Sequence, residues 1–493
     1  MPRDFFHHLS DHKSPPTYKF FNGENWVDSV GKKTTEVISP LDDHVLGRIQ
    51  VVTNSEIDQA ITRAHQAQKL WQDVPMINRA KVLHLAADWM REHEHYLTTL
   101  LVKEIGKTHA EAKDEILRSA DMIDYFAHEG LHVKGEELSG EAFPGYDRTK
   151  MAIVERVPVG VILAIAPFNY PINLSVSKIA PALICGNAVV FKPPTQGSIS
   201  SLHLTEIFYL AGLPKGLIVT VTGGGEAIGN YITTHPGIDM VTFTGSSTVG
   251  KEIAKITGMI PLLFECGGNN PALVLSDADK ELTAVEIVKG AFSYSGQRCT
   301  AIKYVLGFRP TLDKLLPLVV KKTKELIKMG DPRVNTNNLG PVISDMAADT
   351  IEQRIRQATT QGAKIVSGGK RKGRYIEPTI LTDVRPSMEI MRTETFGPVV
   401  SFLSVKSIGE AIEIINASAY GLQASIFTSD EGAGIKLAHL LDVGTVQINS
   451  KPQRGPDHFP FLGIKGSGVG VQGIRYTLEA MSRPKPVVLN KPQ

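Results

Sequence analysis

The sequence of 493 residues has few cysteines, no long hydrophobic run and no excess of charge of either sign. Its three cysteines, Cys185, Cys266 and Cys299, are too few for a disulfide framework and show no paired metal-ligand spacing, which favours a reducing compartment. The most apolar stretch, residues 157–168, is too short to span a bilayer and contains two prolines. The N-terminus lacks the apolar segment and the cleavage site of a signal peptide. These absences predict a cytoplasmic protein with no membrane partner.

The charge balance argues against another class of partner. Lys plus Arg number 53 and Asp plus Glu 51, so the sequence lacks the basic excess of a typical nucleic-acid-binding protein. Any recognition of an anion must therefore be local. No metal site is predicted, because His93 and His95, which flank a glutamate, fall on different faces of a helix.

Helical patterns follow residue 50. Thr53-Asn-Ser-Glu56 has the pattern of a capping box, which predicts a helix start, and further helices are predicted over 77–105 and 108–130. In the last of these, Arg118 lies off the apolar stripe. Without further context, its ordinary interpretation is a solvated ion pair with Asp114, four residues before it.

Most of the remaining chain alternates between strand and helix patterns, which predicts an α/β fold with doubly wound, parallel sheets. Buried strands are predicted at 160–166, 188–192, 217–222, 240–244 and 260–264. A second α/β pattern runs from about residue 270 to 465. A hairpin between 133 and 157 and a terminal strand at 484–490 stand apart from these patterns, and an exposed strand invites pairing with another chain.

Short motifs are spread along the chain in a specific order. They are Pro167-Phe-Asn-Tyr-Pro171, Phe191-Lys-Pro-Pro-Thr-Gln-Gly197, Phe243-Thr-Gly-Ser-Ser-Thr-Val-Gly250, Glu265-Cys-Gly-Gly268, Gly296-Gln-Arg-Cys-Thr300, Glu394-Thr-Phe-Gly-Pro398 and Gln453-Arg-Gly-Pro-Asp-His-Phe-Pro460. With this order and spacing, the chain resembles the aldehyde dehydrogenase superfamily from about residue 20 to its end. Within the superfamily it is similar to the non-phosphorylating, NADP-dependent glyceraldehyde-3-phosphate dehydrogenases.

The resemblance implies two doubly wound, Rossmann-like domains and a small β oligomerisation element. The NADP-binding domain would comprise residues 1–132 and 157–265, and the catalytic domain residues 266–466. The oligomerisation element would comprise residues 133–156 and 467–493. The family usually forms homotetramers, although the sequence does not separate a dimer from a tetramer.

The resemblance also assigns catalytic roles. Cys299 matches the nucleophile, because an aldehyde gives up hydride readily only after a thiolate has formed a tetrahedral adduct with it. Asn169 and the backbone N–H of Cys299 match the oxyanion hole, and Glu265 matches the base that activates water to release the acid from the thioester. Without the resemblance, Cys299 would be interpreted as a small apolar residue and Asn169 as a residue that caps a turn. Glu265 would be interpreted as the end of a strand that faces solvent.

The cofactor assignment depends on the segment around Lys192. In the family this lysine contacts the adenosine ribose, and many NAD-preferring members carry a glutamate three positions later, where this chain has Thr195. A neutral donor there tolerates a 2′-phosphate, so NADP is predicted, with NAD as the weaker alternative. The other residues that match cofactor-binding positions are Gly225, Gly229, Gly245, Ser246, Glu394 and Phe396.

The substrate assignment depends on four positions that hold a phosphate in the phosphotriose enzymes. They are occupied here by Arg118, Tyr170, Arg298 and Arg454. Because a guanidinium is permanently charged and its fork of donors fits phosphate oxygens, a phosphorylated aldehyde is predicted. The predicted reaction is oxidation of D-glyceraldehyde 3-phosphate to 3-phosphoglycerate with NADP.

Alternatives stay open at this point. The enzyme could oxidise another aldehyde, such as lactaldehyde or a semialdehyde, or the chain could be a non-catalytic structural or binding protein on the same fold. Two residues depart from the family pattern: Cys266 stands where a leucine is usual and Asn269 where a lysine is common. Cys266 is interpreted as a small apolar filler, with an oxidation-sensitive site as the alternative.

Overall fold

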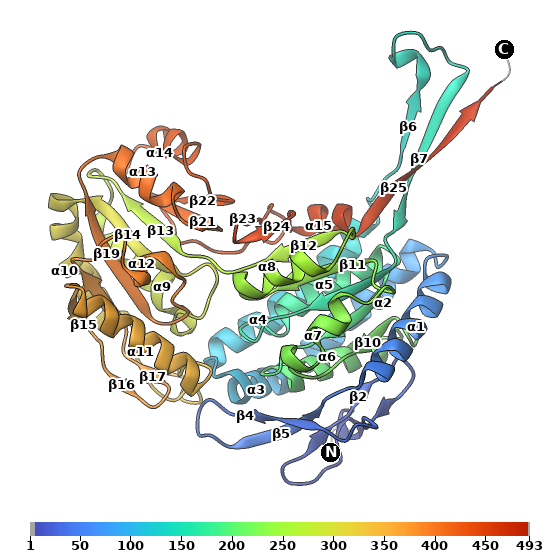
Figure 1. The fold of residues 1–493 in the computed structure, drawn as a ribbon, viewed down its shortest axis with the longest axis horizontal. Helices are drawn as coiled ribbons and strands as arrows, with labels where there is room; N and C mark the ends of the chain where they lie inside the picture. Colours follow the sequence, from blue (N-terminus) through green and yellow to red (C-terminus); the bar gives the residue numbers. More distant parts are fainter. Residues whose placement is uncertain (1–4, 492–493) are drawn as a thin grey trace.

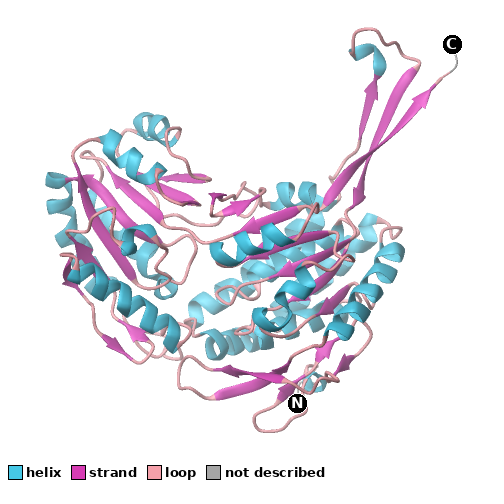
Figure 2. Cartoon of the chain, viewed as in Figure 1, coloured by secondary structure: helices cyan, strands magenta, loops and turns pink. Residues whose placement is uncertain are grey.

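The computed structural model describes residues 5–491, which form two α/β lobes and a projecting arm (Figures 1 and 2). A six-stranded sheet lies at the centre of the first lobe, in the order β10-β9-β8-β11-β12-β24. Its strands are parallel except for β24, and β8, β9 and β11 are buried along their whole length, as expected of a parallel sheet covered by helices. Their bounds are β8 Val161–Ile165, β9 Ala188–Lys192, β10 Ile218–Thr220, β11 Met240–Thr244, β12 Leu262–Glu265 and β24 Gly468–Val469. The strands predicted for this region are confirmed.

Helices surround this sheet. They are α1 Asn54–Trp71, α2 Met76–Glu92, α3 Glu94–Ile105, α4 His109–Gly130, α5 Asn173–Ile184, α6 Ser198–Leu210, α7 Gly225–Thr233, α8 Ser247–Ile256 and α15 Ile474–Ala480. The predicted capping box at the start of α1 is confirmed, with reciprocal bonds between Thr53 and Glu56. The single helix predicted over 77–105 is wrong, because the backbone leaves helical geometry at His93 (φ −101°, ψ 15°) and the ring of His93 donates Nδ1–H to the Trp89 carbonyl over 2.9 Å.

The second lobe is built on a seven-stranded sheet in the order β15-β18-β19-β14-β13-β21-β22. All neighbouring strands are parallel except the edge pair β15 and β18. The strands are β13 Asn270–Val274, β14 Ile302–Phe308, β15 Lys364–Ser367, β18 Thr379–Thr382, β19 Val399–Val405, β21 Gln423–Phe427 and β22 Thr445–Ile448. The helices are α9 Lys280–Phe292, α10 Arg309–Leu326, α11 Asp345–Thr360, α12 Glu389–Arg392, α13 Ile408–Asn416 and α14 Glu431–Ala438. This sheet confirms the second α/β pattern of the sequence.

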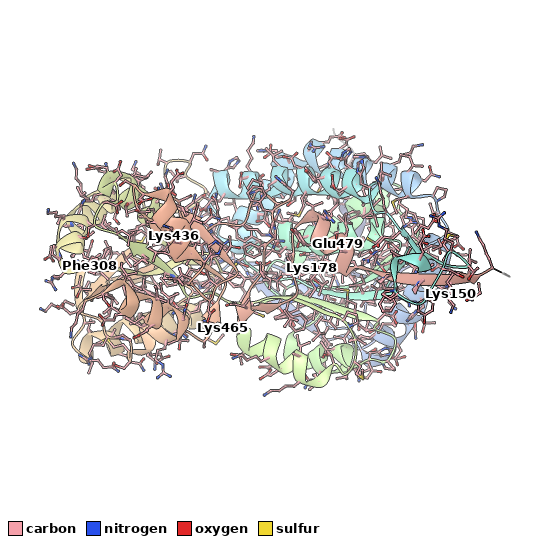
Figure 3. All side chains as sticks on the ribbon, turned by 90° about the horizontal axis from the view of Figure 1, so that it is seen from above. Lys150, Lys178, Phe308, Lys436, Lys465 and Glu479 are labelled. Atoms are coloured by element: carbon pink, nitrogen blue, oxygen red, sulfur yellow. The ribbon has the colours of Figure 1, made fainter. Side chains whose placement is uncertain are left out.

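The arm is a three-stranded antiparallel sheet that leaves the first lobe (Figure 1). It consists of β6 Glu136–Ser139, β7 Lys150–Pro158 and β25 Ser482–Asn490, with β7 in the middle. The terminal strand therefore pairs with the predicted hairpin across more than 300 residues of chain. Lys150, which pairs with Asn490, lies far out on the arm, whereas Lys178 of α5 lies in the middle of the molecule (Figure 3).

Short strands complete the fold. Residues 17–50 form a three-stranded sheet and a hairpin, from β1 Thr17–Tyr18, β2 Phe20–Phe21, β3 Trp26–Val27, β4 Thr34–Ile38 and β5 Val45–Gln50. Two further pairs are β16 Arg371–Lys372 with β17 Tyr375–Ile376, and β20 Tyr420–Gly421 with β23 Ile464–Lys465. Within residues 5–491, no helix has both the length and the apolar character needed to cross a membrane.

Candidate active site

Cys299 lies in a constrained loop between α9 and β14. The loop passes through Tyr294 (φ 48°) and Ser295 (φ 53°), two successive residues in the left-handed region, which side chains disfavour. Hydrogen bonds offset this strain: the Tyr294 N–H donates to Glu111 over 2.7 Å, and the Cys299 carbonyl accepts from the Asn270 amide over 2.8 Å. The loop thus presents the half-buried thiol of Cys299 in a fixed position.

Glu265 is the last residue of β12, and it is buried beside the thiol. Its Oε1 lies 3.4 Å from the Cys299 Sγ, and its Oε2 accepts from Arg454 Nη1 over 2.6 Å. The side chain is only 2% exposed, so the interpretation of Glu265 as a solvent-facing strand end is wrong. The thiol, the carboxylate and the guanidinium form a short chain of contacts.

The pKa of Cys299 is raised well above the usual range of a thiol. Burial is the main cause, and the negative charges of Glu265 and Glu394 add to it, while Arg454 opposes it. Cys299 is therefore a protonated thiol at neutral pH in this structure. The Glu265 carboxylate is in position to take its proton.

Asn169 follows β8 and is 4% exposed. Its Nδ2 donates one hydrogen bond to the Gln297 carbonyl over 2.9 Å, which ties the Asn169 loop to the Cys299 loop. Because an amide NH₂ has two N–H groups, the second is available to an oxygen bound beside Cys299. Asn169 and Cys299 both line the same large cavity.

A polar cavity of about 260 Å³ opens on one side of Cys299. It brings together all four residues that the sequence predicted for phosphate binding, which lie in α4, in the loop after β8, in the Cys299 loop and near the end of the chain. Its lining includes Arg118, Tyr170, Arg298, Arg454, Glu265 and Cys299, and also the acidic residues Glu111 and Asp114.

The arginines differ in how their charges are balanced. Arg298 donates to two hydroxyls, Ser293 Oγ (2.6 Å) and Thr300 Oγ1 (3.1 Å), and among the described residues it forms no ion pair. Arg118 donates from Nε and Nη2 to both carboxylate oxygens of Asp457, each over 2.7 Å. The solvated pair with Asp114 that the helix spacing alone favoured is therefore wrong, since the partner lies 339 residues away in the chain.

A larger cavity of about 660 Å³ lies on the other side of Cys299, between the lobes. Four of the predicted cofactor residues, Gly245, Ser246, Glu394 and Phe396, line it together with Asn169 and Cys299. The loops that follow β8, β11 and β12 all contribute to its wall, as expected at the carboxyl ends of a doubly wound sheet.

The wall of this cavity fits an anionic dinucleotide. Ser246 is the N-cap of α8, so the N-terminus of this helix, with its exposed N–H groups, begins at the cavity wall. The Oγ of Ser247 is buried and has no hydrogen-bond partner within the part of the chain that the structure describes. Glu394 also lines this cavity, where it accepts from the Gly268 N–H over 3.1 Å, and burial raises its pKa to about 7.

The remaining predicted cofactor residues lie outside the lining of that cavity. Lys192 ends β9 and is 8% exposed, and its ammonium donates to the Pro193 carbonyl over 3.4 Å. Burial lowers the pKa of Lys192 to about 8, as expected of a cation to which the described residues offer no nearby counterion. Thr195 is half-buried, and Gly225 and Gly229, in α7, have open space where a side chain would start.

Sequence reasoning missed three buried charged residues near the cavities. Lys178 of α5 donates to Thr244 Oγ1 over 2.7 Å, and burial lowers its pKa to about 7. Lys107 and Glu115 form a fully buried ion pair below Tyr170. Periodicity places Lys178 and Glu115 in helices, whereas Lys107 lies in the loop before α4, and in no case does it indicate the partner.

Cys266, noted from the sequence, also lines the larger cavity. It is 5% exposed, and burial raises its pKa to about 12. Both values fit a small apolar filler better than a reactive thiol.

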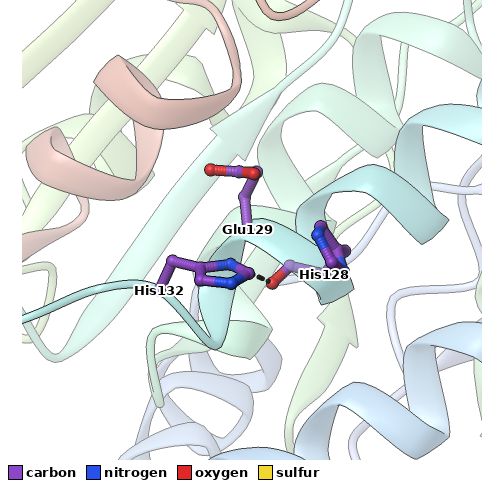
Figure 4. A group of neighbouring side chains, drawn as sticks. All are labelled: His128, Glu129 and His132. Atoms are coloured by element: carbon purple, nitrogen blue, oxygen red, sulfur yellow. Dashed lines mark hydrogen bonds between the residues drawn. The ribbon is translucent and has the colours of Figure 1, made fainter.

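His128, Glu129 and His132 form a separate cluster at the end of α4 (Figure 4). Their possible metal-ligating atoms lie within 4.8 Å of one another, and both histidines are exposed. At about 1.5 Å per helical residue, the cluster is roughly 15 Å along α4 from Arg118. It therefore lies outside the candidate active site.

Cys299, Glu265 and Asn169 thus lie together between the larger cavity, which has room for a dinucleotide, and the polar cavity, which is lined by arginines. This arrangement, on two doubly wound sheets, is typical of an enzyme that oxidises aldehydes. The family model "Aldehyde dehydrogenase family" matches residues 26–487, and the chain belongs to that family.

Individual relatives narrow the comparison. The chain is 45% identical over 477 residues to the NADP-dependent glyceraldehyde-3-phosphate dehydrogenase of Pisum sativum, covering 96% of each chain. A crystal structure of NADP-dependent glyceraldehyde-3-phosphate dehydrogenase from Bacillus halodurans C-125, complexed with NADP, is 46% identical, with a TM-score of 0.94 over 96% of this chain and 99% of the other. A 3-sulfolactaldehyde dehydrogenase of Priestia aryabhattai is 35% identical over 471 residues, or 96% of this chain and 97% of the relative.

Proposed function

We propose that the protein oxidises D-glyceraldehyde 3-phosphate to 3-phosphoglycerate with NADP, without using inorganic phosphate. The observation that carries the proposal is the polar cavity, in which Arg118, Arg298 and Arg454 converge within reach of the Cys299 thiol. Arg118 and Arg454 are paired with Asp457 and Glu265, whereas Arg298 has no ion-pair partner among the described residues, so an anionic group on the aldehyde would supply its counter-charge. The names and complexes of the relatives support the same substrate and cofactor.

The first step is attack on the aldehyde. Glu265 takes the thiol proton across the 3.4 Å contact, and the Cys299 sulfur forms a bond to the carbonyl carbon. The carbonyl oxygen becomes an oxyanion, which the second N–H of the Asn169 amide and the Cys299 backbone N–H stabilise. When bound, NADP accepts the hydride that leaves this adduct.

The second step is release of the acid. Loss of hydride leaves a thioester on Cys299, and water must attack its carbonyl carbon. Glu265 is the base for this water as well, after it has passed the first proton to solvent. The C–S bond then breaks, 3-phosphoglycerate leaves, and the cysteine is restored.

Arg454 connects specificity to this chemistry. In the described structure it bonds the Glu265 carboxylate over 2.6 Å and Gln472 over 2.8 Å. A substrate phosphate in the polar cavity competes with Glu265 for the same guanidinium. Binding of the phosphate would therefore free one oxygen of the base.

A panel of substrates tests the proposal. The purified protein, with NADP and D-glyceraldehyde 3-phosphate, is expected to form NADPH and 3-phosphoglycerate at a rate that does not depend on added phosphate. 3-Sulfolactaldehyde belongs in the panel because a sulfonate also suits an arginine pocket and one relative carries that name. Lactaldehyde and succinate semialdehyde represent the remaining alternatives. Higher kcat/KM for any of these, or for NAD, would overturn this assignment.

The domain division and the assembly belong to the same proposal. Residues 1–132 and 157–265 would form the NADP-binding domain, and residues 266–466 would form the catalytic domain. Residues 133–156 and 467–493 would assemble the chain into a homotetramer in the cytoplasm. Support for assembly comes from the arm, whose apolar side chains Leu138, Phe143, Ile153 and Val488 are exposed in one chain.

A further inference from the structure

Two charged side chains lie completely buried beneath the polar cavity. Lys107 stands between the end of α3 and the start of α4, and Glu115 lies two turns into α4. Both side chains are 0% exposed, and the Lys107 ammonium contacts a Glu115 carboxylate oxygen. A buried ion pair stabilises a fold little compared with apolar residues of the same size, so its presence calls for another role.

Lys107 contacts the aromatic ring of the cavity. Its Nζ lies 3.4 Å from the centroid of the Tyr170 ring and 4.8 Å from that of Tyr294. The two rings are nearly perpendicular, with their centroids 6.1 Å apart. A cation desolvated against a ring face holds that ring strongly, because the attraction is not screened by water. The orientation of the Tyr170 ring is thereby fixed from below.

Glu115 holds the same segment through its backbone. Its second carboxylate oxygen accepts from the N–H groups of Ile172 (2.9 Å) and Asn173 (3.1 Å), at the start of α5. These residues follow directly on the Asn169-Tyr170-Pro171 segment. One carboxylate thus fixes both the cation under Tyr170 and the chain immediately after Tyr170.

We infer that Lys107 and Glu115 are a buried positioning pair, which sets Tyr170 for contact with the anionic group of the substrate. The inference rests on the proposed function, because it needs Tyr170 to bind that group. Neither residue touches the cavity, since the lining includes Tyr170 but neither Lys107 nor Glu115. Their effect on the substrate must therefore pass through Tyr170 and its segment.

The test removes both charges together. In the double variant Lys107→Met, Glu115→Gln, the amide oxygen of the new glutamine can still accept from the two N–H groups, so the fold is expected to survive. KM for D-glyceraldehyde 3-phosphate should rise about tenfold, the effect of losing one hydrogen bond to a charged group, whereas kcat/KM for unphosphorylated glyceraldehyde should change less than about twofold. Lys103→Met, at an exposed position of α3, is the matched control and should leave both constants unchanged.

The same change in a Tyr170→Phe background shows whether the pair acts through the tyrosine. If it does, the double variant should have almost no further effect on KM once the phenol is gone. An equal loss for both aldehydes, or an undiminished loss in the Tyr170→Phe background, would overturn the positioning role. If the double variant does not fold, Lys107→Arg, which keeps the charge but displaces it, is put through the same cycle with the same criteria.

Failure of the pair and failure of the proposed function give different results. A wild-type protein without activity on D-glyceraldehyde 3-phosphate would overturn the proposed function. If the wild-type protein is active and the Lys107→Met, Glu115→Gln variant has an unchanged KM for D-glyceraldehyde 3-phosphate, only the positioning role is overturned.

Discussion

At the scale of single residues, each carboxylate oxygen of Glu265 contacts a different side chain, and the two contacts have different roles. One carboxylate oxygen faces the Cys299 thiol at 3.4 Å, and the other is bound by Arg454 at 2.6 Å. The first contact suits removal of the thiol proton, and the second holds the carboxylate in place. A single buried carboxylate can thus serve both proton transfers, provided that water reaches it after the hydride has left.

Kinetics of two variants separate these transfers. Cys299→Ala should abolish NADPH formation, because no adduct can form. Glu265→Gln should lower the steady-state rate by about 10² to 10⁴, the usual contribution of a general base, and should also slow the initial burst of NADPH, because the base for the thiol proton is lost too. Rapid-mixing absorbance of NADPH measures both. A Cys299→Ala protein with normal turnover would contradict the thioester mechanism.

Arg454 and Arg118 allow a test of the anion site. Arg454→Leu removes a charge beside Glu265 as well as from the cavity, whereas Arg118→Leu leaves Glu265 its partner and removes the bonds to Asp457 and to the Arg454 carbonyl. Both should raise KM for D-glyceraldehyde 3-phosphate by about tenfold or more, consistent with loss of a charge-assisted hydrogen bond. Arg118→Leu should spare unphosphorylated glyceraldehyde, whereas Arg454→Leu should also lower kcat with it, because the Glu265 carboxylate loses the bond that holds it. Steady-state kinetics with the two aldehydes give the comparison, and equal losses on both substrates in Arg118→Leu would argue against a phosphate site.

At the scale of elements, the ends of strands could be located from the sequence and the partners between distant elements could not. Glu265 and Lys192 each end a continuous apolar run, so their place at the carboxyl edge of the sheet follows from strand length and strand alternation. Asp457, the partner of Arg118, lies 339 residues away from it, and Lys107, in the loop before α4, meets Glu115 at a separation of 8 residues, which is too long for a contact within one helix. No local pattern encodes such pairs. The resemblance to the family assigned Arg118 to the phosphate site, whereas the helical spacing alone predicted a residue on the surface.

The end of β9 gives a pH-dependent prediction. The pKa of Lys192 is lowered to about 8 by burial, and a bound 2′-phosphate would raise it again. Because NADP then binds the protonated lysine preferentially, affinity should fall by no more than about twofold between pH 7 and 8 and more steeply above pH 8, by up to about tenfold per pH unit. Titration of NADP by calorimetry from pH 7 to 9.5 measures this. In Lys192→Met, binding should be weaker at pH 7 and flat across the same range; a wild-type affinity that rises with pH would contradict the assignment.

At the scale of the whole molecule, the arm is the part whose apolar side chains a single chain leaves exposed. Its three strands pair with one another, yet opposite residues such as Ile153 and Val487 remain 43% and 46% exposed on the same face of the sheet. Apolar cross-strand pairs far from the core gain little unless another surface covers them. A tetramer built through the arms would supply that surface.

Placing charges on this face should break the assembly. Ile153→Glu together with Val487→Glu puts two like charges opposite each other on the arm, so the proposed tetramer is expected to dissociate into smaller species at micromolar concentration. Light scattering coupled to size-exclusion chromatography measures the mass. Glu155→Gln with Lys485→Gln, the facing pair two positions along the same strands, removes charge without burying any and should keep the wild-type mass. A monomeric wild-type protein, or an unchanged mass in the doubly charged variant, would show that the arm does not hold the subunits together.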